Sequence, residues 1–419
     1  MAGAGENLGP EPFSTIPPEQ QEELKAALKK GDLVAAASKA REVLASLDKV
    51  GLNIAVTGIA GSGKSSFVNA MRGVEDGDRD TATTGVTETT SKPACFPHPQ
   101  YPNVILWDLA GIGTPTFRAD TYLQQVQFDR YDFFIIVSSP RFTEHDIKLA
   151  SEIQGLGKRF YFVRAKVDQD LVNERRLYDQ SGCLKRPSAS RPPQYDEAAI
   201  LKTIRDNCIG NLQKGGMDFQ QVFLVSNWST NEYDFPKLQE TLLHDLPSHK
   251  RLVFLRSLSN LSKETLKEKK KYLMDQVWLK SLASLGAGVV PVPGFATERN
   301  AVLLVTSLTQ CCQDFGLDEH SLDGIARRTN KPIEELRAVI KSPLGQEITK
   351  DLVLKLLSKA VGGAVKNTLV FNNILPIVCP VLGSVVSGIL SYKTMYSLLE
   401  GFLNDAADDA IRVLEKASK

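Results

Sequence analysis

Short apolar runs alternate with amphipathic stretches through the middle of the chain. The apolar runs, rich in β-branched and aromatic residues, stand at 53–57, 104–107, 132–138, 159–165 and 222–226. Continuous runs of this kind are typical of strands that are buried on both faces of a sheet. Helical patterns at 65–71, 144–154, 197–212 and 237–246 separate the runs. This alternation predicts an α/β domain with a mostly parallel sheet flanked by helices, and the stretch at 182–193 predicts a mobile surface loop within it.

Both ends of the chain have helical patterns only. Residues 18–47 predict two short helices, the second capped by Asp32, and residues 250–419 predict further helices with stops at 291–294, 331–332, 342–343 and 362–363. Because short helices depend on packing, we expect both ends to form one all-α domain. The predicted organisation is a disordered segment at 1–16, N-terminal helices at 17–49, the α/β domain at 50–248 and a C-terminal helical domain at 249–419.

A glycine-rich loop joins the first predicted strand to its helix. The sequence GIAGSGKS (58–65) has the GxxxxGKS spacing of a phosphate-binding loop. Its glycines let successive amide groups face phosphates, and the helix N-terminus adds partial positive charge. We expect Lys64 to reach the β- and γ-phosphates of a nucleotide and the Ser65 hydroxyl to bind Mg²⁺. The candidate residues of this loop are Gly58, Gly61, Ser62, Gly63, Lys64, Ser65 and Ser66.

A second motif follows the next predicted strand. Asp108 and Gly111 form a DxxG sequence directly after the run at 104–107. An aspartate at this place can hold Mg²⁺ through water, and the Gly111 amide can contact the γ-phosphate. We therefore predict that Asp108 completes the Mg²⁺ site of Ser65.

Two further loops predict the choice of base. Lys166 and Asp168 follow the run at 159–165, and Ser226 and Asn227 end the run at 222–226. A carboxylate accepts both the N1 and N2 hydrogens of guanine, whereas adenine would leave the buried charge badly paired. The Lys166 stem can cover one face of the base. The order of the motifs favours GTP and GDP as ligands, with an NTPase of no base specificity as the alternative.

A threonine-rich segment at 83–90 is the candidate switch. It holds five threonines in eight residues, and one hydroxyl is expected to join the Mg²⁺ shell when GTP is bound. Thr84, followed by Gly85, is the first choice and Thr90 the second. The alternative is an exposed polar loop that leads into a strand.

These motifs together resemble the immunity-related, interferon-inducible GTPase family. The resemblance covers about residues 20–415 and includes the FGLDEHSL stretch at 315–322. It implies a Ras-like P-loop GTPase domain and a helical domain built from both chain ends. The stretches KKGDLVAAA, VVPVPGFA and SPLGQEIT are similar to the testis-type "cinema" branch. The segments that carry the resemblance in the GTPase domain are WDLAGIG (107–113), YDFFIIVS (131–138), FYFVRAKVD (160–168), FLVSN (223–227), YDFPKL (233–238) and DLPSHKR (245–251).

The resemblance also implies activity and partners. Members are dynamin-like enzymes that assemble with GTP and serve cell-autonomous defence on intracellular membranes, so a second copy and a membrane surface are the expected partners. Activation occurs in trans between two GTPase domains, and Glu88 matches the glutamate implicated there. This chain departs from the family pattern at Ala110, where proline is usual, and at Ala165, where threonine is usual. Neither departure removes a predicted ligand.

The catalytic prediction follows from a residue that is absent. Ras-like enzymes orient the attacking water with a glutamine after DxxG, but Ile112 stands there. The isolated domain is therefore expected to hydrolyse GTP slowly until self-assembly completes the site. The candidate catalytic residues are Lys64, Thr84, Glu88 and Gly111. A GTP-regulated scaffold with negligible turnover is the alternative.

The composition limits the classes of binding partner and the cellular compartment that we expect for this chain. Fifty basic and 49 acidic residues leave a net charge of +1, which argues against a broad nucleic-acid surface. The lysine run at 267–271 predicts a solvated helix face, with a local basic patch as the alternative. Six scattered cysteines predict buried free thiols in a reducing compartment. The N-terminus shows no signal peptide, and Ala2 removes the usual myristoylation signal, so we expect a cytoplasmic protein.

Three segments of the sequence are compatible either with burial in the core or with contact with a membrane. The apolar stretches at 279–297 and 367–392 are long enough for a bilayer span, yet prolines, glycines and asparagines interrupt the second. We expect both to be buried core, with reversible membrane contact as the first alternative. The amphipathic, basic segment at 351–366 fits a core-facing helix or a membrane-surface helix.

Overall fold

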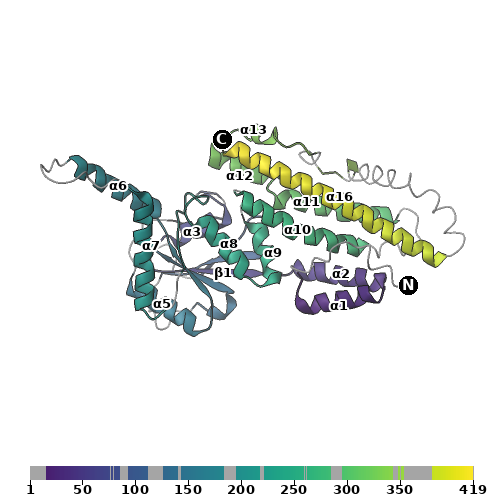
Figure 1. Cartoon of the computed structure of the whole chain (residues 1–419), viewed down its shortest axis with the longest axis horizontal. Coiled ribbons are helices and arrows are strands. Elements are labelled where there is room, and N and C mark those ends of the chain that lie inside the picture. The colour runs from purple at the N-terminus through teal and green to yellow at the C-terminus, as the bar shows by residue number, and fades with distance from the viewer. Residues whose placement is uncertain are drawn as a thin grey trace. The chain divides into compact units, whose positions relative to one another are not determined.

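The chain forms two compact units, Gly51–Asp245 and the combination of Met1–Val50 with Leu246–Lys419. We call them the α/β unit and the helical unit (Figure 1). The computed structural model describes residues 16–75, 77–78, 80–84, 93–111, 126–139, 143–183, 195–217, 221–258, 260, 262–284, 295–342, 348–349, 351–352 and 380–418.

Six described strands form the sheet of the α/β unit, in the order β2-β3-β1-β4-β5-β6. Every pairing is parallel except that of β2 with β3. Five strands confirm the apolar runs of the sequence, whereas the antiparallel edge strand β2 was not predicted. The strands are β1 Leu52–Thr57, β2 Ala94–Pro97, β3 Val104–Asp108, β4 Phe133–Ser138, β5 Phe160–Arg164 and β6 Val222–Leu224.

The register of the sheet brings the predicted loops together. Val56 stands opposite Asp108, so the loops that leave β1 and β3 start side by side. Arg164 stands opposite Leu224, so the loops that leave β5 and β6 also start side by side. All four loops leave the carboxyl ends of their strands, and in open parallel sheets ligands bind at those ends.

Helices flank this sheet and bury its faces. Leu149 and Ile153 of α5 and Leu212 of α7 pack in one cluster with Phe134 and Phe162. Residues 182 and 183, predicted as the start of a loop, end helix α6, and residues 184–194 lie outside the described part. The helical elements of this unit are α3 Lys64–Arg72, η1 Phe128–Arg130, α5 Glu144–Gly155, α6 Val167–Cys183, α7 Glu197–Lys214 and α8 Phe235–Asp245.

The helical unit is built from both ends of the chain, as predicted. Ala36 and Ala40 of α2 lie in one apolar cluster with Trp278 and Leu282 of α10. Asp32 caps α2 by accepting a 2.9 Å hydrogen bond from the Ala35 amide. The elements are α1 Pro18–Lys29, α2 Leu33–Leu47, α9 Ser248–Ser257, α10 Lys263–Ser284, α11 Phe295–Asp314, α12 Glu319–Thr329, α13 Ile333–Arg337 and α16 Pro380–Ala417.

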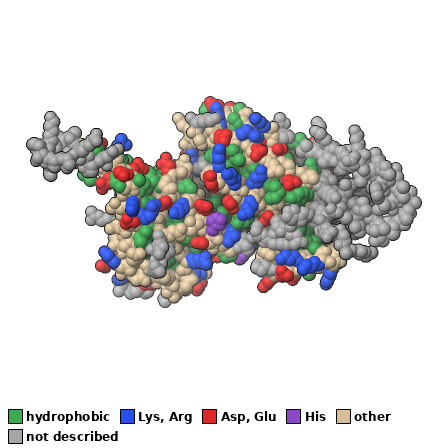
Figure 2. All heavy atoms as spheres, viewed as in Figure 1, with side chains coloured by type: hydrophobic (Ala, Val, Ile, Leu, Met, Phe, Trp, Pro, Cys, Tyr) green, Lys and Arg blue, Asp and Glu red, His purple; other side chains and the backbone are tan. Residues whose placement is uncertain are grey.

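Two surface expectations need correction. Lys267 and Lys271 are exposed as expected for a solvated face, but Lys269 is buried at 1% exposure. Cys95 is exposed because the edge strand β2 turns its side chain outward, whereas Cys208, Cys311 and Cys312 are buried free thiols. The side chains of the two remaining cysteines lie outside the described residues. Figure 2 shows basic and acidic side chains interspersed over the face in view, which agrees with the net charge of +1.

The apolar stretch that begins at residue 279 contributes to the core where it is described. Leu279, Leu282 and Ala283 are buried against the N-terminal helices. Side chains at 367–392 and nearly all of 351–366 lie outside the described residues. Within the described ranges, no helix combines the length and apolar character that a bilayer span requires.

Candidate functional site

The loop between β1 and α3 has a backbone that requires glycine. Gly58, Gly61 and Gly63 have φ values of +139°, +78° and +93°. A Cβ on Gly58 would lie 2.1 Å from the carbonyl oxygen of Val137 on β4. Glycine tolerates both the positive φ and the close approach, so the loop can lie against the end of the sheet.

The first turn of α3 carries the predicted phosphate ligands. The N-cap Gly63 has no side chain with which to cap the turn, so the helix N-terminus suits an anion. Lys64 is only 7% exposed, and its Nζ donates a 2.9 Å hydrogen bond to the Ile59 carbonyl within the loop. The ammonium group is therefore held over the loop. Ser62 is buried, and its hydroxyl has no hydrogen-bond partner among the described residues.

Ser65 and Asp108 bring two oxygen groups together. Ser65 Oγ lies 2.5 Å from Asp108 Oδ2, and Asp108 is 1% exposed at the end of β3. Hydroxyl and carboxylate oxygens are the ligands that Mg²⁺ prefers. The donor set at this point therefore fits the predicted ion.

Gly111 joins the second motif to the phosphate loop. A Cβ on Gly111 would lie 2.8 Å from the backbone N and Cα of Ala60. Only glycine allows this approach without a shift of either segment. The Gly111 backbone is thereby held beside the loop that carries Lys64.

The two base loops also contact the phosphate loop. Lys166 adopts a positive φ of +63°, and its Nζ donates a 3.0 Å hydrogen bond to the Gly61 carbonyl. Asn227 Nδ2 donates to the Gly63 carbonyl over 3.2 Å. The loops after β5 and β6 therefore converge on the loop after β1.

Buried acceptors stand in these base loops. Asp168 Oδ1 and Asn227 Oδ1 are buried and have no hydrogen-bond partner in the described part of the chain. Buried polar atoms of native proteins are nearly always hydrogen-bonded. A ligand edge that presents N–H donors, as guanine does, would satisfy the Asp168 carboxylate.

A buried polar layer supports the base loops. The Val167 amide donates to the Val225 carbonyl over 3.3 Å. The Ser226 hydroxyl, fully buried, accepts a 3.3 Å bond from the Trp228 amide. Arg164 and Asp170 form a 2.6 Å ion pair beside them. Burial raises the pKa of the Asp170 carboxyl, and Arg164 opposes that rise.

The structure leaves the switch largely outside its described residues. Thr84 is described and exposed, whereas Gly85, Glu88, Thr90 and Ile112 lie outside the described ranges. Ser66, in the first turn of α3, is half-buried. Sequence reasoning did not identify the backbone of Ile59, Ala60 and Val137 as part of the site, because a carbonyl contact has no signature in residue type.

Comparisons with known proteins agree with this geometry. The sequence matches the Interferon-inducible GTPase (IIGP) family over residues 17–417. Interferon-inducible GTPase 5 of Rattus norvegicus is 44% identical over 95% of this chain and 82% of its own length. The Bos taurus protein of that name is 45% identical with the same coverage. Interferon-gamma-inducible GTPase 10 of Mus musculus is 34% identical over 96% of this chain and 90% of its own.

Similarity to solved structures is lower. Toc33 from Arabidopsis thaliana, crystallised with GDP and Mg²⁺, is 16% identical and covers 51% of this chain and 81% of its own, with a TM-score of 0.30. The assignment of this chain to a family therefore rests on the family match and on the relatives. The chain belongs to the interferon-inducible GTPase family.

Proposed function

We propose that this chain binds GTP with Mg²⁺ and hydrolyses it to GDP and phosphate. The observation that carries the proposal is the convergence of both base loops and the Ser65–Asp108 pair on one glycine-rich loop. Membership of a family named for GTPase activity supports the same reaction.

Each group has a role in this proposal. Lys64 binds the β- and γ-phosphates, and the Gly111 amide donates to the γ-phosphate. Ser65, Asp108 and Thr84, or Thr90 in its place, hold Mg²⁺, which neutralises charge that develops on the phosphate oxygens when bound. The remaining loop residues bind phosphates through the backbone, namely Gly58, Gly61, Ser62, Gly63, Ser66 and Gly85.

Base choice depends on the loops after β5 and β6. Asp168 accepts hydrogen bonds from the guanine N1 and N2 groups, and the stem of Lys166 covers one face of the ring. Asn227 and Ser226 close the other side. The unsatisfied Asp168 Oδ1 supports this assignment.

Hydrolysis is activated by GTP-dependent pairing of two copies. With Ile112 in the place of a water-orienting glutamine, the catalytic group must come from elsewhere, and we assign it to Glu88 of the switch. Trp228, directly after Asn227, is 70% exposed and offers an apolar contact to a partner beside the base loop.

The cellular role follows from the family. The relatives carry names that record interferon induction. We extend this to a role in cell-autonomous defence, with the protein in the cytoplasm and peripheral on intracellular membranes. The test is whether the full chain relocates to vesicle-rich fractions with GTP and not with GDP.

The enzymatic proposal is tested by phosphate release from GTP and from ATP under single-turnover conditions with excess protein. The proposal predicts release from GTP only, and release that needs Mg²⁺. Equal release from both nucleotides would refute the base assignment. GTP binding without release at any protein concentration would favour the alternative, a GTP-regulated scaffold.

A further inference from the structure

A stripe of side chains on α3 faces the segment that leads into the candidate switch. Ser65, Asn69 and Arg72 follow one another at intervals of four and three residues, so they lie on one face of the helix. Asn69 is 3% exposed and Arg72 is 4% exposed, although asparagine and arginine are usually found at protein surfaces. Both buried side chains therefore need hydrogen-bond partners, and the facing segment supplies them.

Asn69 holds Ala82 with two hydrogen bonds. Its Nδ2 donates to the Ala82 carbonyl over 3.0 Å, and its Oδ1 accepts from the Ala82 amide over 2.8 Å. The side-chain amide thus pairs with the backbone of one residue as a neighbouring antiparallel strand would. Ala82 is itself 1% exposed, so water does not compete for either bond. The backbone at position 82 is therefore fixed to α3.

Arg72 joins the two flanks of the candidate switch. Its Nη1 donates to the Asp80 carbonyl over 2.9 Å, and its Nε donates to the Pro97 carbonyl over 3.0 Å. Asp80 precedes the threonine-rich segment, and Pro97 ends strand β2 after it. The pairing of β2 with β3 also places Ala94 opposite Asp108. Both flanks of the candidate switch are therefore tied to elements that carry the proposed Mg²⁺ ligands.

The fixed backbone at Ala82 lies close to the level of the proposed Mg²⁺ ligand Ser65. Four residues of an α-helix rise about 6 Å, which separates Ser65 from Asn69 along the helix axis. Thr84 follows Ala82 by two residues, and two extended residues span up to about 7 Å. This length of chain is sufficient to bring Thr84 back to the level of Ser65. Thr90 follows Ala82 by eight residues, so its position depends much less on this anchor.

We propose that Asn69 and Arg72 are positioning residues, which hold the N-terminal flank of the switch so that Thr84 reaches Mg²⁺ when GTP is bound. The inference rests on the proposed function, because it requires Mg²⁺ at Ser65 and Asp108. The γ-phosphate of GTP orders switch segments of this kind, and GDP lacks that phosphate. The anchor therefore contributes to the binding of GTP and not to the binding of GDP.

The test compares the affinities of the full chain for a non-hydrolysable GTP analogue and for GDP, each with and without Mg²⁺. Asn69→Leu keeps the branched shape of the side chain and removes both hydrogen bonds to Ala82. We expect it to weaken Mg²⁺-dependent binding of the analogue about tenfold and to change GDP affinity less than about twofold. Arg72→Met removes the links to both flanks and should shift the ratio of the two affinities in the same direction.

Tyr161→Phe is the matched control, because it removes a hydroxyl group of a buried side chain in the same unit. That hydroxyl bonds the Asp245 carboxylate over 2.5 Å, and its loss should leave both affinities unchanged. A double variant tests the route of the effect. When Thr84→Val has already removed the proposed ligand, adding Asn69→Leu should weaken the analogue no further.

The outcomes separate the anchor from the proposed function. A wild-type chain whose affinity for the analogue does not depend on Mg²⁺ would refute the Mg²⁺ site itself. Where that dependence is present, the anchor is tested on the variant, Asn69→Leu or Arg72→Met, whose circular dichroism spectrum matches the wild type. The anchor is overturned if that variant weakens the analogue and GDP equally, if it weakens neither, or if its full effect persists together with Thr84→Val.

Discussion

Ser65 Oγ and Asp108 Oδ2 lie 2.5 Å apart although the two residues come from different loops. They meet because β1 and β3 pair in parallel with Val56 opposite Asp108. The sheet register therefore brings the proposed Mg²⁺ ligands together, beside the glycine-rich loop to which we assign phosphate binding.

Lys64→Ala should lower the affinity for GTP about 10- to 100-fold, because hydrogen bonds to charged groups contribute about 1.5–3 kcal/mol. Fluorescent-nucleotide titration measures the effect. Lys202→Ala is the control, since Lys202 is an exposed lysine of α7. Normal GTP affinity in Lys64→Ala would show that the ammonium group does not bind the phosphates.

Asp168→Asn should lower GTP affinity about 100-fold or more and raise the affinity for xanthosine triphosphate, whose 2-oxo group accepts from an amide. Competition titration with both nucleotides gives the ratio of the two affinities. Asp179→Asn changes an exposed carboxylate of α6 and should leave both affinities unchanged. If Asp168→Asn kept the guanine preference, the base would lie elsewhere.

Gly58→Ala and Gly61→Ala separate steric overlap from backbone strain. Both positions have positive φ, which costs about 1–2 kcal/mol for alanine. Among the described residues, the new Cβ would meet an atom only at Gly58, where the Val137 carbonyl oxygen lies 2.1 Å away, since no described atom lies within 4 Å at Gly61. Gly58→Ala should therefore lower the unfolding midpoint of the α/β unit further. Equal midpoints for the two variants would contradict the described packing of the loop.

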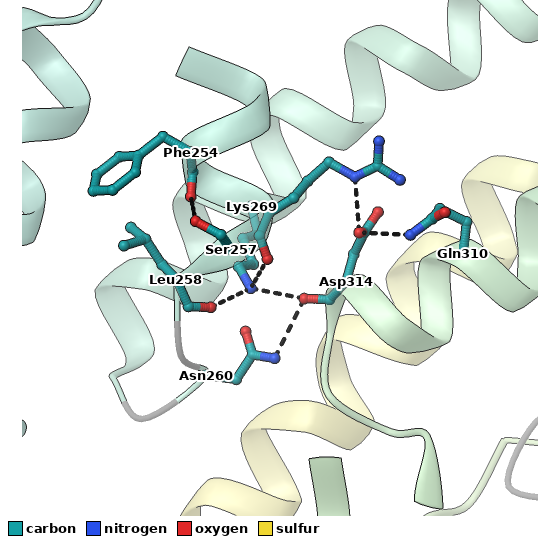
Figure 3. A network of polar contacts seen from close by, with 8 residues as sticks. Phe254, Ser257, Leu258, Asn260, Lys269, Gln310 and Asp314 are labelled. Atoms are coloured by element: carbon teal, nitrogen blue, oxygen red, sulfur yellow. Dashed lines mark hydrogen bonds and ion pairs between the residues drawn. The ribbon is translucent and has the colours of Figure 1, made fainter. Parts of the chain in front are cut away.

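The burial of Lys269 in the polar network of Figure 3 predicts that the stability of helix α10 in the helical unit depends on pH. Burial lowers its pKa from 10.5 to about 7, with Asp314 opposing and Arg256 assisting. Since the folded pKa is the lower one, the unfolded chain binds more protons between about pH 7 and 10.5. The free energy of opening α10 should therefore rise with pH there, by up to about 1.4 kcal/mol per unit.

Hydrogen exchange of α10, corrected for intrinsic rates at pH 7 to 9, measures that slope. Lys269→Met should remove it, and the exposed-lysine control Lys267→Met should keep it. The other charged groups facing Lys269 are Arg256 and Asp314, and both are retained in the two variants. Identical slopes in wild type and Lys269→Met would contradict the assignment.

The parts of the site that lie in contiguous motifs could be predicted from the sequence. Residues 58–65 carry their own strand, turn and helix signals, and Asp108 and Asp168 follow apolar runs. The edge strand β2 could not be predicted in this way. Its four residues alternate between half-buried and exposed and include Pro97, so no buried apolar run marks it.

The burial of a side chain by other helices also could not be predicted from the sequence. Lys269 stands in a run of lysines that looks solvated, and only the carbonyl ends of α9 and α11 explain its burial. The contacts of Lys166 with Gly61 and of Asn227 with Gly63 involve backbone acceptors. Residue identity does not encode such acceptors, so tertiary packing decides them.

The most direct test of the account is GTP turnover per molecule measured over a hundredfold range of protein concentration. We predict that turnover rises with concentration in the wild type, because Ile112 cannot orient the water and a second copy must complete the site. Glu88→Ala should keep GTP affinity and lose the rise, leaving the slow basal rate. Turnover that stays constant across the range in the wild type would contradict activation by pairing, and a preserved rise in Glu88→Ala would contradict the role of Glu88.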